Sequence, residues 1–434
     1  MKTAYPEYIR QGAIPSLDAP DERHEGPIIP LARHILRQAF SLGASDIHLE
    51  PGARQMEVRC RIDGVLQPLL RLPRNLQDSL ISRFKIMAAM DIGEKRLPQD
   101  GRIQSSWENR QIDVRVSSLP TLHGEKLVLR ILDQEKNQFG LEDMGFSRKN
   151  RLALENLIQQ PYGLILITGP TGSGKTSTLY ALMRTLQDPG KNLITVEDPI
   201  EYQMEGISQV AVQPKIGLTF AACLRTILRQ DPDLIMVGEI RDGQTAAMSV
   251  HAALTGHLVL STLHTNTAAG AVSRLLDLGT DPHLLAAALR GVVSQRLVRK
   301  LCPECRIAER EGRDSWVGDY FLEPEEDSHL FYAAGGCTAC RHTGYRGRIA
   351  VHEVFPFSEA CRQALSHGAG EQELTRMARE EGVPSLFQDG RDKVRQGVTS
   401  IRELLRVYGP LPLDRPKPPI RKENNSCLSP VDPI

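Results

Sequence analysis

One octapeptide of this sequence has the residue types and spacing that bind the phosphate chain of a nucleotide. It fits the pattern G-x-x-x-x-G-K-[ST] and consists of Gly169, Pro170, Thr171, Gly172, Ser173, Gly174, Lys175 and Thr176. The glycines let the backbone curl so that successive N–H groups converge on phosphate oxygens at a helix N-terminus. Lys175 would neutralise the β and γ phosphates, and the Thr176 hydroxyl would bind Mg²⁺. The apolar run 164–168 before the motif and a helix from about Ser177 supply the strand and helix that it requires.

Acidic side chains follow two later apolar runs that have the length of buried strands. Residues 193–196 are followed by Glu197-Asp198-Pro199-Ile200-Glu201, and residues 234–237 by Gly238-Glu239. Ligands collect at the carboxyl ends of the strands in an open parallel sheet, and carboxylates placed there can position Mg²⁺ or deprotonate water. Each acid could instead be a solvated cap. Their recurrence beside one phosphate loop favours the catalytic interpretation.

Two histidines and two arginines are further candidates for contacting the γ-phosphate. His257 and His264 bracket the apolar run 258–263, and we interpret them as phosphate sensors, although satisfied polar residues are the simpler alternative. Arg115 and Arg130 lie on expected strands far from the phosphate loop in sequence, where solvated strand arginines are the simpler alternative. As arginine fingers they would accelerate hydrolysis by ~10³ to 10⁵.

Two C-x-x-C pairs predict a metal site. Cys302 and Cys305 are separated by 31 residues from Cys337 and Cys340. Four thiolates suit a closed, tetrahedral Zn²⁺ site, which we expect to be structural because no open coordination position is implied. A redox role is the alternative. The remaining four cysteines are not paired in the sequence. In an unexported protein, the paired cysteines are therefore better explained as metal thiolates than as disulfides.

The elements that must position these residues fall into two groups along the chain. Alternating apolar and polar residues at 56–62 and 112–116, with a turn at Asp63-Gly64, predict a small α+β domain over residues 28–133. After a linker at 134–148, short apolar runs alternate with helical segments and predict a doubly wound α/β core over residues 149–408, which includes a zinc-binding insertion at 301–345 and C-terminal helices. We expect residues 1–27 and the Pro-rich residues 409–434 to be flexible tails.

Composition narrows the classes of function. The chain has 434 residues, of which 41% are hydrophobic, and equal numbers of basic and acidic residues, 53 each, so no overall basic excess points to nucleic acid or an anionic membrane. The N-terminus lacks the apolar core of a signal peptide. The longest uncharged stretch, residues 252–273, is interrupted by Thr, His and Asn, which predicts buried sheet with polar loops rather than a membrane span.

Four segments in this order resemble the Walker A, Asp, Walker B and His boxes of the secretion ATPases that drive type II secretion and type IV pili. They are GPTGSGKT at 169–176, ITVEDPIEY at 194–202, VGEIRD at 237–242 and GHLVLSTLHTN at 256–266. The resemblance covers about residues 44–407. The four cysteines followed by GYRGR at 344–348 resemble the secretion and pilus-assembly branches, whereas retraction motors generally lack the cysteines.

The resemblance implies a RecA-like P-loop core preceded by a PAS-like domain, with ATP, Mg²⁺ and structural Zn²⁺ as cofactors. It also implies a role for each matching residue: phosphate binding for Lys175, Mg²⁺ binding for Thr176, general base for Glu201, Walker B acid for Glu239, sensors for His257 and His264, and γ-phosphate contact for Arg115 and Arg130. Hydrolysis would drive pseudopilus assembly and thereby protein export.

Members of this family are similar in working as homohexameric rings in which the two domains rotate against each other. The resemblance implies a cytoplasmic protein, peripheral at the inner membrane, with a polytopic platform protein and a bitopic recruiter as partners. Longer members carry a further N-terminal domain that docks on this machinery, and only about 27 tail-like residues precede the first domain here.

Three alternative functions remain. The first is assembly of a true type IV pilus. The second is a DNA-translocating ATPase, which would need a basic groove with interleaved aromatic residues. Aromatic residues make up only 5% of the chain and residues 290–300 are the sole dense basic stretch, so we expect no nucleic-acid partner. The third is a zinc-stabilised switch that binds ATP without hydrolysing it.

Overall fold

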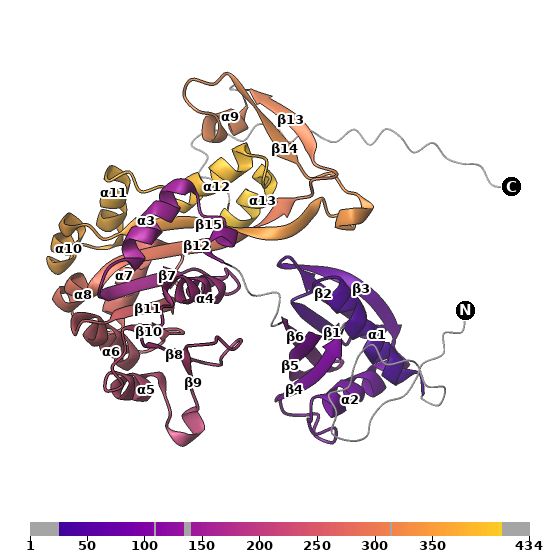
Figure 1. The fold of residues 1–434 in the computed structure, drawn as a ribbon. Coiled ribbons are helices and arrows are strands. Elements are labelled where there is room, and N and C mark those ends of the chain that lie inside the picture. The colour runs from indigo at the N-terminus through magenta and orange to yellow at the C-terminus, as the bar shows by residue number, and fades with distance from the viewer. Residues whose placement is uncertain (1–25, 108–109, 134–139, 313–314, 410–434) are drawn as a thin grey trace.

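The computed structural model describes residues 26–107, 110–133, 140–312 and 315–409. Figure 1 shows an N-terminal unit, in indigo and purple, beside a larger unit that continues to the yellow C-terminal helices. The predicted tails at 1–27 and 409–434 lie almost wholly outside the described residues. Among the described residues, no helix is both long and apolar enough to cross a membrane.

The N-terminal unit is an antiparallel sheet covered on one face by two helices, which agrees with the predicted α+β class, although the second helix was not predicted. The strands run in the order β3-β2-β1-β6-β5-β4. Buried residues of the helices and of the inner strand faces, such as Leu36, Ile47, Phe84 and Val114, form one core. The elements are α1 (Ile28–Ser41), β1 (Asp46–Glu50), β2 (Gln55–Ile62), β3 (Val65–Pro73), α2 (Gln77–Met87), β4 (Gln99–Trp107), β5 (Arg110–Thr121) and β6 (Gly124–Asp133).

The larger unit has a sheet of seven strands in the order β15-β12-β7-β11-β10-β8-β9, and each pair is parallel except β12 with β15. The four apolar runs predicted as buried strands are β7, β8, β10 and β11. The strands are β7 (Gly163–Thr168), β8 (Leu193–Glu197), β9 (Ser208–Ala211), β10 (Leu234–Val237), β11 (Leu258–Leu263), β12 (Leu289–Leu301) and β15 (Tyr345–Pro356).

Helices cover both faces of this sheet. On β7, Leu164 and Leu166 pack into one core, and Ile165 and Ile167 into the other. A strand buried on both faces must be apolar at every position, which explains the continuous hydrophobic runs. The helices are α3 (Arg148–Ile158), α4 (Lys175–Leu186), α5 (Phe220–Ile227), α6 (Gly243–Leu254), α7 (Ala268–Asp277), α8 (Pro282–Ala288), α10 (Glu359–Ser366), α11 (Glu371–Glu380), α12 (Leu386–Arg395) and α13 (Ile401–Tyr408).

Two sequence expectations differ from the structure. The stretch 252–273 is not sheet with polar loops alone, because it contains the end of α6, all of β11 and the first residues of α7. In the predicted linker, residues 134–139 lie outside the described part. Leu141 and Met144 form a 3-10 turn and are buried in the core beside α3, so the polar and glycine-rich composition concealed two anchoring residues.

The cysteine-bearing segment is an insertion between the long antiparallel strands β12 and β15. It contains β13 (Ile307–Gly312), α9 (Trp316–Phe321) and β14 (Ser328–Ala333), and its own small core packs against α12 and α13. These elements were not predicted, since each has only six residues and is too short to show a clear helical or strand period.

Candidate active site

The phosphate-loop motif joins β7 to α4, as predicted. Gly172 and Gly174 have φ values of 78° and 87°, which side-chain-bearing residues rarely adopt. A Cβ at Gly169 would lie 2.3 Å from the Gln295 carbonyl oxygen on β12. Glycine at these positions lets the loop curl tightly between β7 and α4.

The side chains of the loop fit an anionic ligand. The Lys175 Nζ atom is buried and donates to the carbonyl oxygens of Gly169 at 2.9 Å and Pro170 at 3.3 Å. Burial lowers the pKa of Lys175, and the nearby Glu239 carboxylate opposes this shift. The Ser173 Oγ atom is buried without a hydrogen-bond partner among the described residues, and Thr176 is exposed at the first turn of α4. A phosphate chain would supply an acceptor for the Ser173 hydroxyl and could replace the two carbonyl oxygens as acceptors for Lys175.

Gln295 on β12 braces the phosphate loop through two side-chain hydrogen bonds. The Gln295 Nε2 atom donates to the Ser173 carbonyl oxygen at 2.7 Å, and its Oε1 atom accepts from Thr178 Oγ1 at 2.8 Å. Gln295 is 1% exposed. Sequence reasoning missed this residue because it lies more than a hundred positions from the loop, and only the parallel pairing of β12 with β7 brings them together.

Glu239 and His264 lie at the carboxyl edge of the sheet beside Lys175. The His264 Nε2 atom is 3.6 Å from Glu239 Oε2, and its Nδ1 atom is 3.5 Å from Lys175 Nζ. Burial and the adjacent Lys175 charge lower the pKa of His264, so the imidazole is neutral near pH 7. A neutral imidazole can donate one hydrogen bond to a phosphate oxygen without adding a fixed charge.

Of the two glutamates at and just after the end of β8, one has a structural role and the other is a candidate for reaction. Glu197 is buried and accepts hydrogen bonds from Tyr180, Thr195 and Gln209, so its carboxylate is fully occupied. Glu201 is more open, and its backbone N–H donates to the Tyr180 hydroxyl of α4 at 3.3 Å. Burial raises the pKa of Glu201, against the opposing charges of Arg115 and Arg130. A raised carboxyl pKa is the usual adjustment for a general base.

The two predicted arginines lie on the face of the N-terminal sheet that is turned toward Glu201. Arg115 on β5 and Arg130 on β6 are directly opposite each other. The Arg115 guanidinium is 3.5 Å from the Glu201 carboxylate. Both arginines line a cavity of about 700 Å³ whose other wall includes Pro199 and Ile200. The structure therefore brings cations of one unit to the predicted base of the other.

His257 lies away from this group. It precedes β11, and its carbonyl oxygen accepts from the N–H of Gly163 at the start of β7, so it occupies the amino edge of the sheet. The phosphate loop follows the opposite end of β7, six residues of strand away. His257 Nδ1 instead lies 3.0 Å from the Ala252 carbonyl oxygen. The structure therefore does not bring His257 to the phosphate loop of its own chain, because residues that bracket a strand lie at opposite edges of the sheet.

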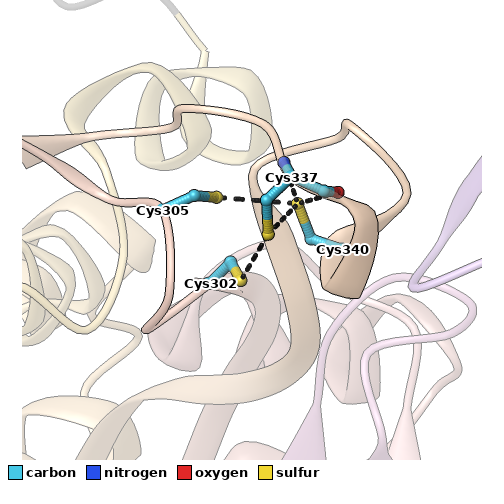
Figure 2. A group of neighbouring side chains, drawn as sticks. All are labelled: Cys302, Cys305, Cys337 and Cys340. Atoms are coloured by element: carbon cyan, nitrogen blue, oxygen red, sulfur yellow. Dashed lines mark hydrogen bonds between the residues drawn. The ribbon is translucent and has the colours of Figure 1, made fainter.

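The four predicted metal-binding cysteines converge (Figure 2), and their sulfur atoms all lie within 4.8 Å of one another. The pairs Cys302–Cys337, Cys305–Cys340 and Cys337–Cys340 are 3.9, 3.6 and 3.7 Å apart. Four sulfurs around a tetrahedral zinc at about 2.3 Å are about 3.8 Å apart, so these distances fit the ion and not disulfides.

Backbone amides support the cysteine cluster. Burial raises the pKa of Cys340, but the N–H groups of Cys337 and Gly344, each 3.2 Å from its sulfur, together with the thiols of Cys305 and Cys337, outweigh this and lower the pKa to about 6. Such hydrogen bonds orient a thiolate and keep it ready for a metal.

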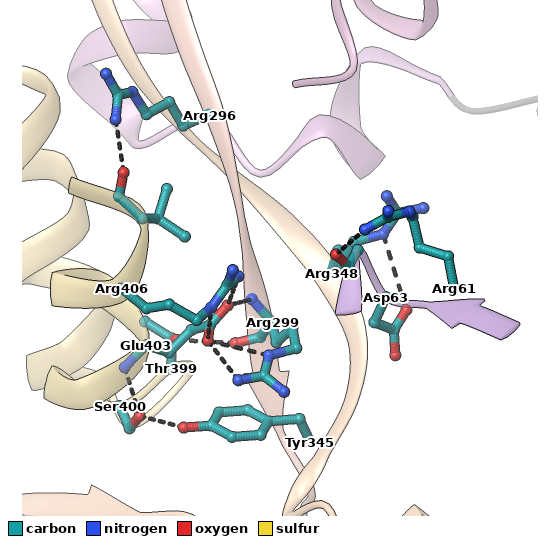
Figure 3. A network of polar contacts seen from close by, with 12 residues as sticks. Arg61, Asp63, Arg296, Arg299, Tyr345, Arg348, Thr399, Ser400, Glu403 and Arg406 are labelled. Atoms are coloured by element: carbon teal, nitrogen blue, oxygen red, sulfur yellow. Dashed lines mark hydrogen bonds and ion pairs between the residues drawn. The ribbon is translucent and has the colours of Figure 1, made fainter. Parts of the chain in front are cut away.

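The base of the insertion is fixed to the larger unit and touches the N-terminal one (Figure 3). The buried Glu403 of α13 accepts from Arg299 of β12 and from Arg406. On the other side of β15, the N–H of Gly347 donates to Asp63 Oδ2 of the N-terminal unit at 2.8 Å. The first residues of β15, which follow the cysteine insertion, are thus one of the places where the two units meet.

Comparison with known proteins identifies the family. The model of the family "Type II/IV secretion system protein" matches residues 21–406. The chain belongs to this family. Type II secretion system protein E of Pseudomonas aeruginosa is 48% identical over 90% of this chain and 77% of its own length, and type II secretion system ATPase E of Vibrio cholerae is 47% identical with the same coverage.

Two solved structures share the fold of this chain. The ATPase DotB of Legionella pneumophila has a TM-score of 0.64 at 23% identity and covers 89% of this chain and 96% of its own. The pilus retraction motor PilT with bound ADP has a TM-score of 0.56 at 26% identity and covers 87% of this chain and 97% of its own.

Proposed function

We propose that this chain is an ATP-hydrolysing motor of a type II secretion system. The observation that carries the proposal is the contact of Arg115 with Glu201, which follows β8 at the same edge of the sheet where Lys175, Glu239 and His264 cluster. Groups that bind phosphate, a carboxylate with a raised pKa and cations from a second unit are the components that phosphoryl transfer to water requires. The P. aeruginosa and V. cholerae relatives, named as type II secretion proteins, support the biological context.

Each residue has a proposed task. The loop amides and Lys175 would hold the β and γ phosphates, and Thr176 and Glu239 would hold Mg²⁺ directly or through water, where the ion would neutralise phosphate charge. Glu201 would orient and deprotonate the attacking water. Arg115 and Arg130 would stabilise the charge on the transferred phosphoryl group, and His264 would donate to it. His257 has no part in this proposal.

We also propose a homohexamer at the cytoplasmic face of the inner membrane, bound through a platform protein and a bitopic recruiter. A ring suits a site that is completed by arginines of the N-terminal unit. Rotation of that unit against the larger unit would then couple hydrolysis to movement. The tetracysteine site would bind structural Zn²⁺.

Type IV pilus assembly is the second candidate, since PilT belongs to a pilus machine and shares the fold at 26% identity. The higher identity to type II secretion proteins favours secretion. A DNA-translocating role has less support. The basic stretch 290–300 forms β12 inside the sheet, where Arg296 and Arg299 are bonded to α13 and do not line an open groove.

Two substitutions test the hydrolytic proposal. Lys175→Ala should abolish ATP binding, measured by isothermal titration with Mg²⁺. Glu201→Gln should keep ATP binding and lose turnover by at least about 10²-fold, because a glutamine cannot accept the proton of the water. Normal turnover in Glu201→Gln would show that another residue is the base.

A further inference from the structure

The outer face of the N-terminal sheet carries a row of charged residues set by strand register. Arg61, Asp46, Arg130, Arg115 and Arg102 lie directly opposite one another on β2, β1, β6, β5 and β4. Directly opposed residues of antiparallel strands project from the same face. One carboxylate therefore stands within a row of arginines that leads to the cavity beside Glu201.

That carboxylate, Asp46, has a side chain only 9% exposed and its two oxygens are used differently. The Oδ1 atom accepts from Arg130 Nε at 3.0 Å. The Oδ2 atom accepts from Ser45 Oγ at 2.9 Å and lies 3.7 Å from Arg61 Nε. Asp46 is thus anchored on one side and holds Arg130 with the other.

The hydrogen bond to Asp46 does not use the terminal nitrogens of Arg130, which can therefore bind a ligand. Within the described residues its bond to Asp46 uses Nε alone, and its side chain is 61% exposed in the wall of the cavity. Arg102, by contrast, gives both Nε and a terminal nitrogen to Asp113. A guanidinium gripped at Nε keeps its plane fixed and presents two terminal N–H₂ groups, the fork that binds a phosphate.

We propose that Asp46 is a positioning residue that orients Arg130 toward the terminal phosphate of bound ATP. This inference rests on the proposed function, in which Arg130 contacts the γ-phosphate. Without Asp46, Arg130 would sample several rotamers and meet the phosphate less often in the reactive geometry. A misplacement of about 1 Å in such a group costs about 10²-fold in rate.

The test compares Asp46→Ala and Asp46→Asn with Glu50→Gln. Glu50 lies on the same strand and face and also pairs with both neighbouring strands, through Arg59 at 2.6 Å and Lys126 at 2.7 Å, but neither of these partners lines the cavity, whereas Arg130 does. Turnover, ADP affinity and melting temperature are measured for each, together with Arg130→Ala and the double variant Asp46→Ala/Arg130→Ala.

We expect Asp46→Ala to lower turnover by about 10²-fold, Asp46→Asn by less because its amide oxygen still accepts from Nε, and Glu50→Gln hardly at all. ADP affinity should stay unchanged, and the double variant should be no slower than Arg130→Ala. If Asp46→Ala does not fold, the same cycle is run with Asp46→Asn.

Three results would overturn the inference. The first is slow turnover in Arg130→Ala with normal turnover in both Asp46 variants, and the second is strictly additive losses in the double variant. Either would show that Asp46 does not act through Arg130, and the proposed function would stand. Wild-type turnover in Arg130→Ala would remove the proposed role of the arginine itself.

Discussion

Replacing Gln295 by leucine should loosen the phosphate loop. Leucine has nearly the same size, but it cannot donate to the Ser173 carbonyl oxygen or accept from the Thr178 hydroxyl, two contacts of 2.7 and 2.8 Å in the native protein. The Thr178 hydroxyl retains the Gly174 carbonyl oxygen as an acceptor at 3.3 Å. The Ser173 carbonyl loses its buried donor, which costs about 1–3 kcal/mol.

The expected consequences follow from this magnitude. A loss of about 1–3 kcal/mol in a unit of this size lowers the melting temperature by roughly 2–10 °C. Because the Gln295 hydrogen bonds order the loop before the nucleotide binds, part of the lost free energy should weaken nucleotide binding. A loss of about 1.4 kcal/mol corresponds to a tenfold larger dissociation constant. We expect a weaker ATP affinity of about this size.

Differential scanning calorimetry without nucleotide and isothermal titration with ATP and Mg²⁺ measure the two effects. Gln363→Leu, on the exposed surface of α10, is the matched control for replacing a glutamine by leucine. If Gln295→Leu melts and binds ATP as the control does, the brace has no energetic role and the reasoning is refuted.

Three further outcomes follow from the site. The raised pKa of Glu201 places the acid limb of the pH profile of turnover above the ordinary carboxyl value of 4.5. Arg115→Ala should move that limb to still higher pH, because it removes a charge that lowers this pKa. An acid limb that does not move would show that Arg115 does not influence the group that titrates. Cys340→Ser should reduce bound zinc from about one ion per chain to nearly none by atomic absorption, whereas Cys223→Ala should keep it; equal zinc contents would refute the tetracysteine site. Tyr180→Phe should lower the melting temperature, since the buried Glu197 carboxylate loses a donor at a cost of about 1–3 kcal/mol, and a melting curve like that of the wild type would contradict this.

Local patterns were sufficient for much of the fold. The phosphate loop, the buried strands of the larger unit and the cysteine pairs depend on residues close together in sequence, so their geometry follows from short motifs and continuous apolar runs. The same holds for the hairpin of β2 and β3, whose Asp63-Gly64 turn has positive φ at both residues.

Contacts set by strand order and direction could not be predicted in this way. Gln295 reaches the loop only because β12 pairs with β7, and Asp46 meets Arg130 only because β1 pairs with β6. His257 was assigned a role on proximity in sequence to β11, but strand direction places it at the far edge of the sheet. A single sequence contains no direct record of such pairings.

The central claim is that cations of the N-terminal unit and the phosphate loop of the larger unit act on the same ATP. The most direct measurement is the steady-state turnover of Arg115→Ala/Arg130→Ala, with ATP affinity determined in parallel. The account predicts turnover lower by at least about 10³-fold with ATP still bound, as expected for loss of arginine fingers. Wild-type turnover in this variant would contradict it.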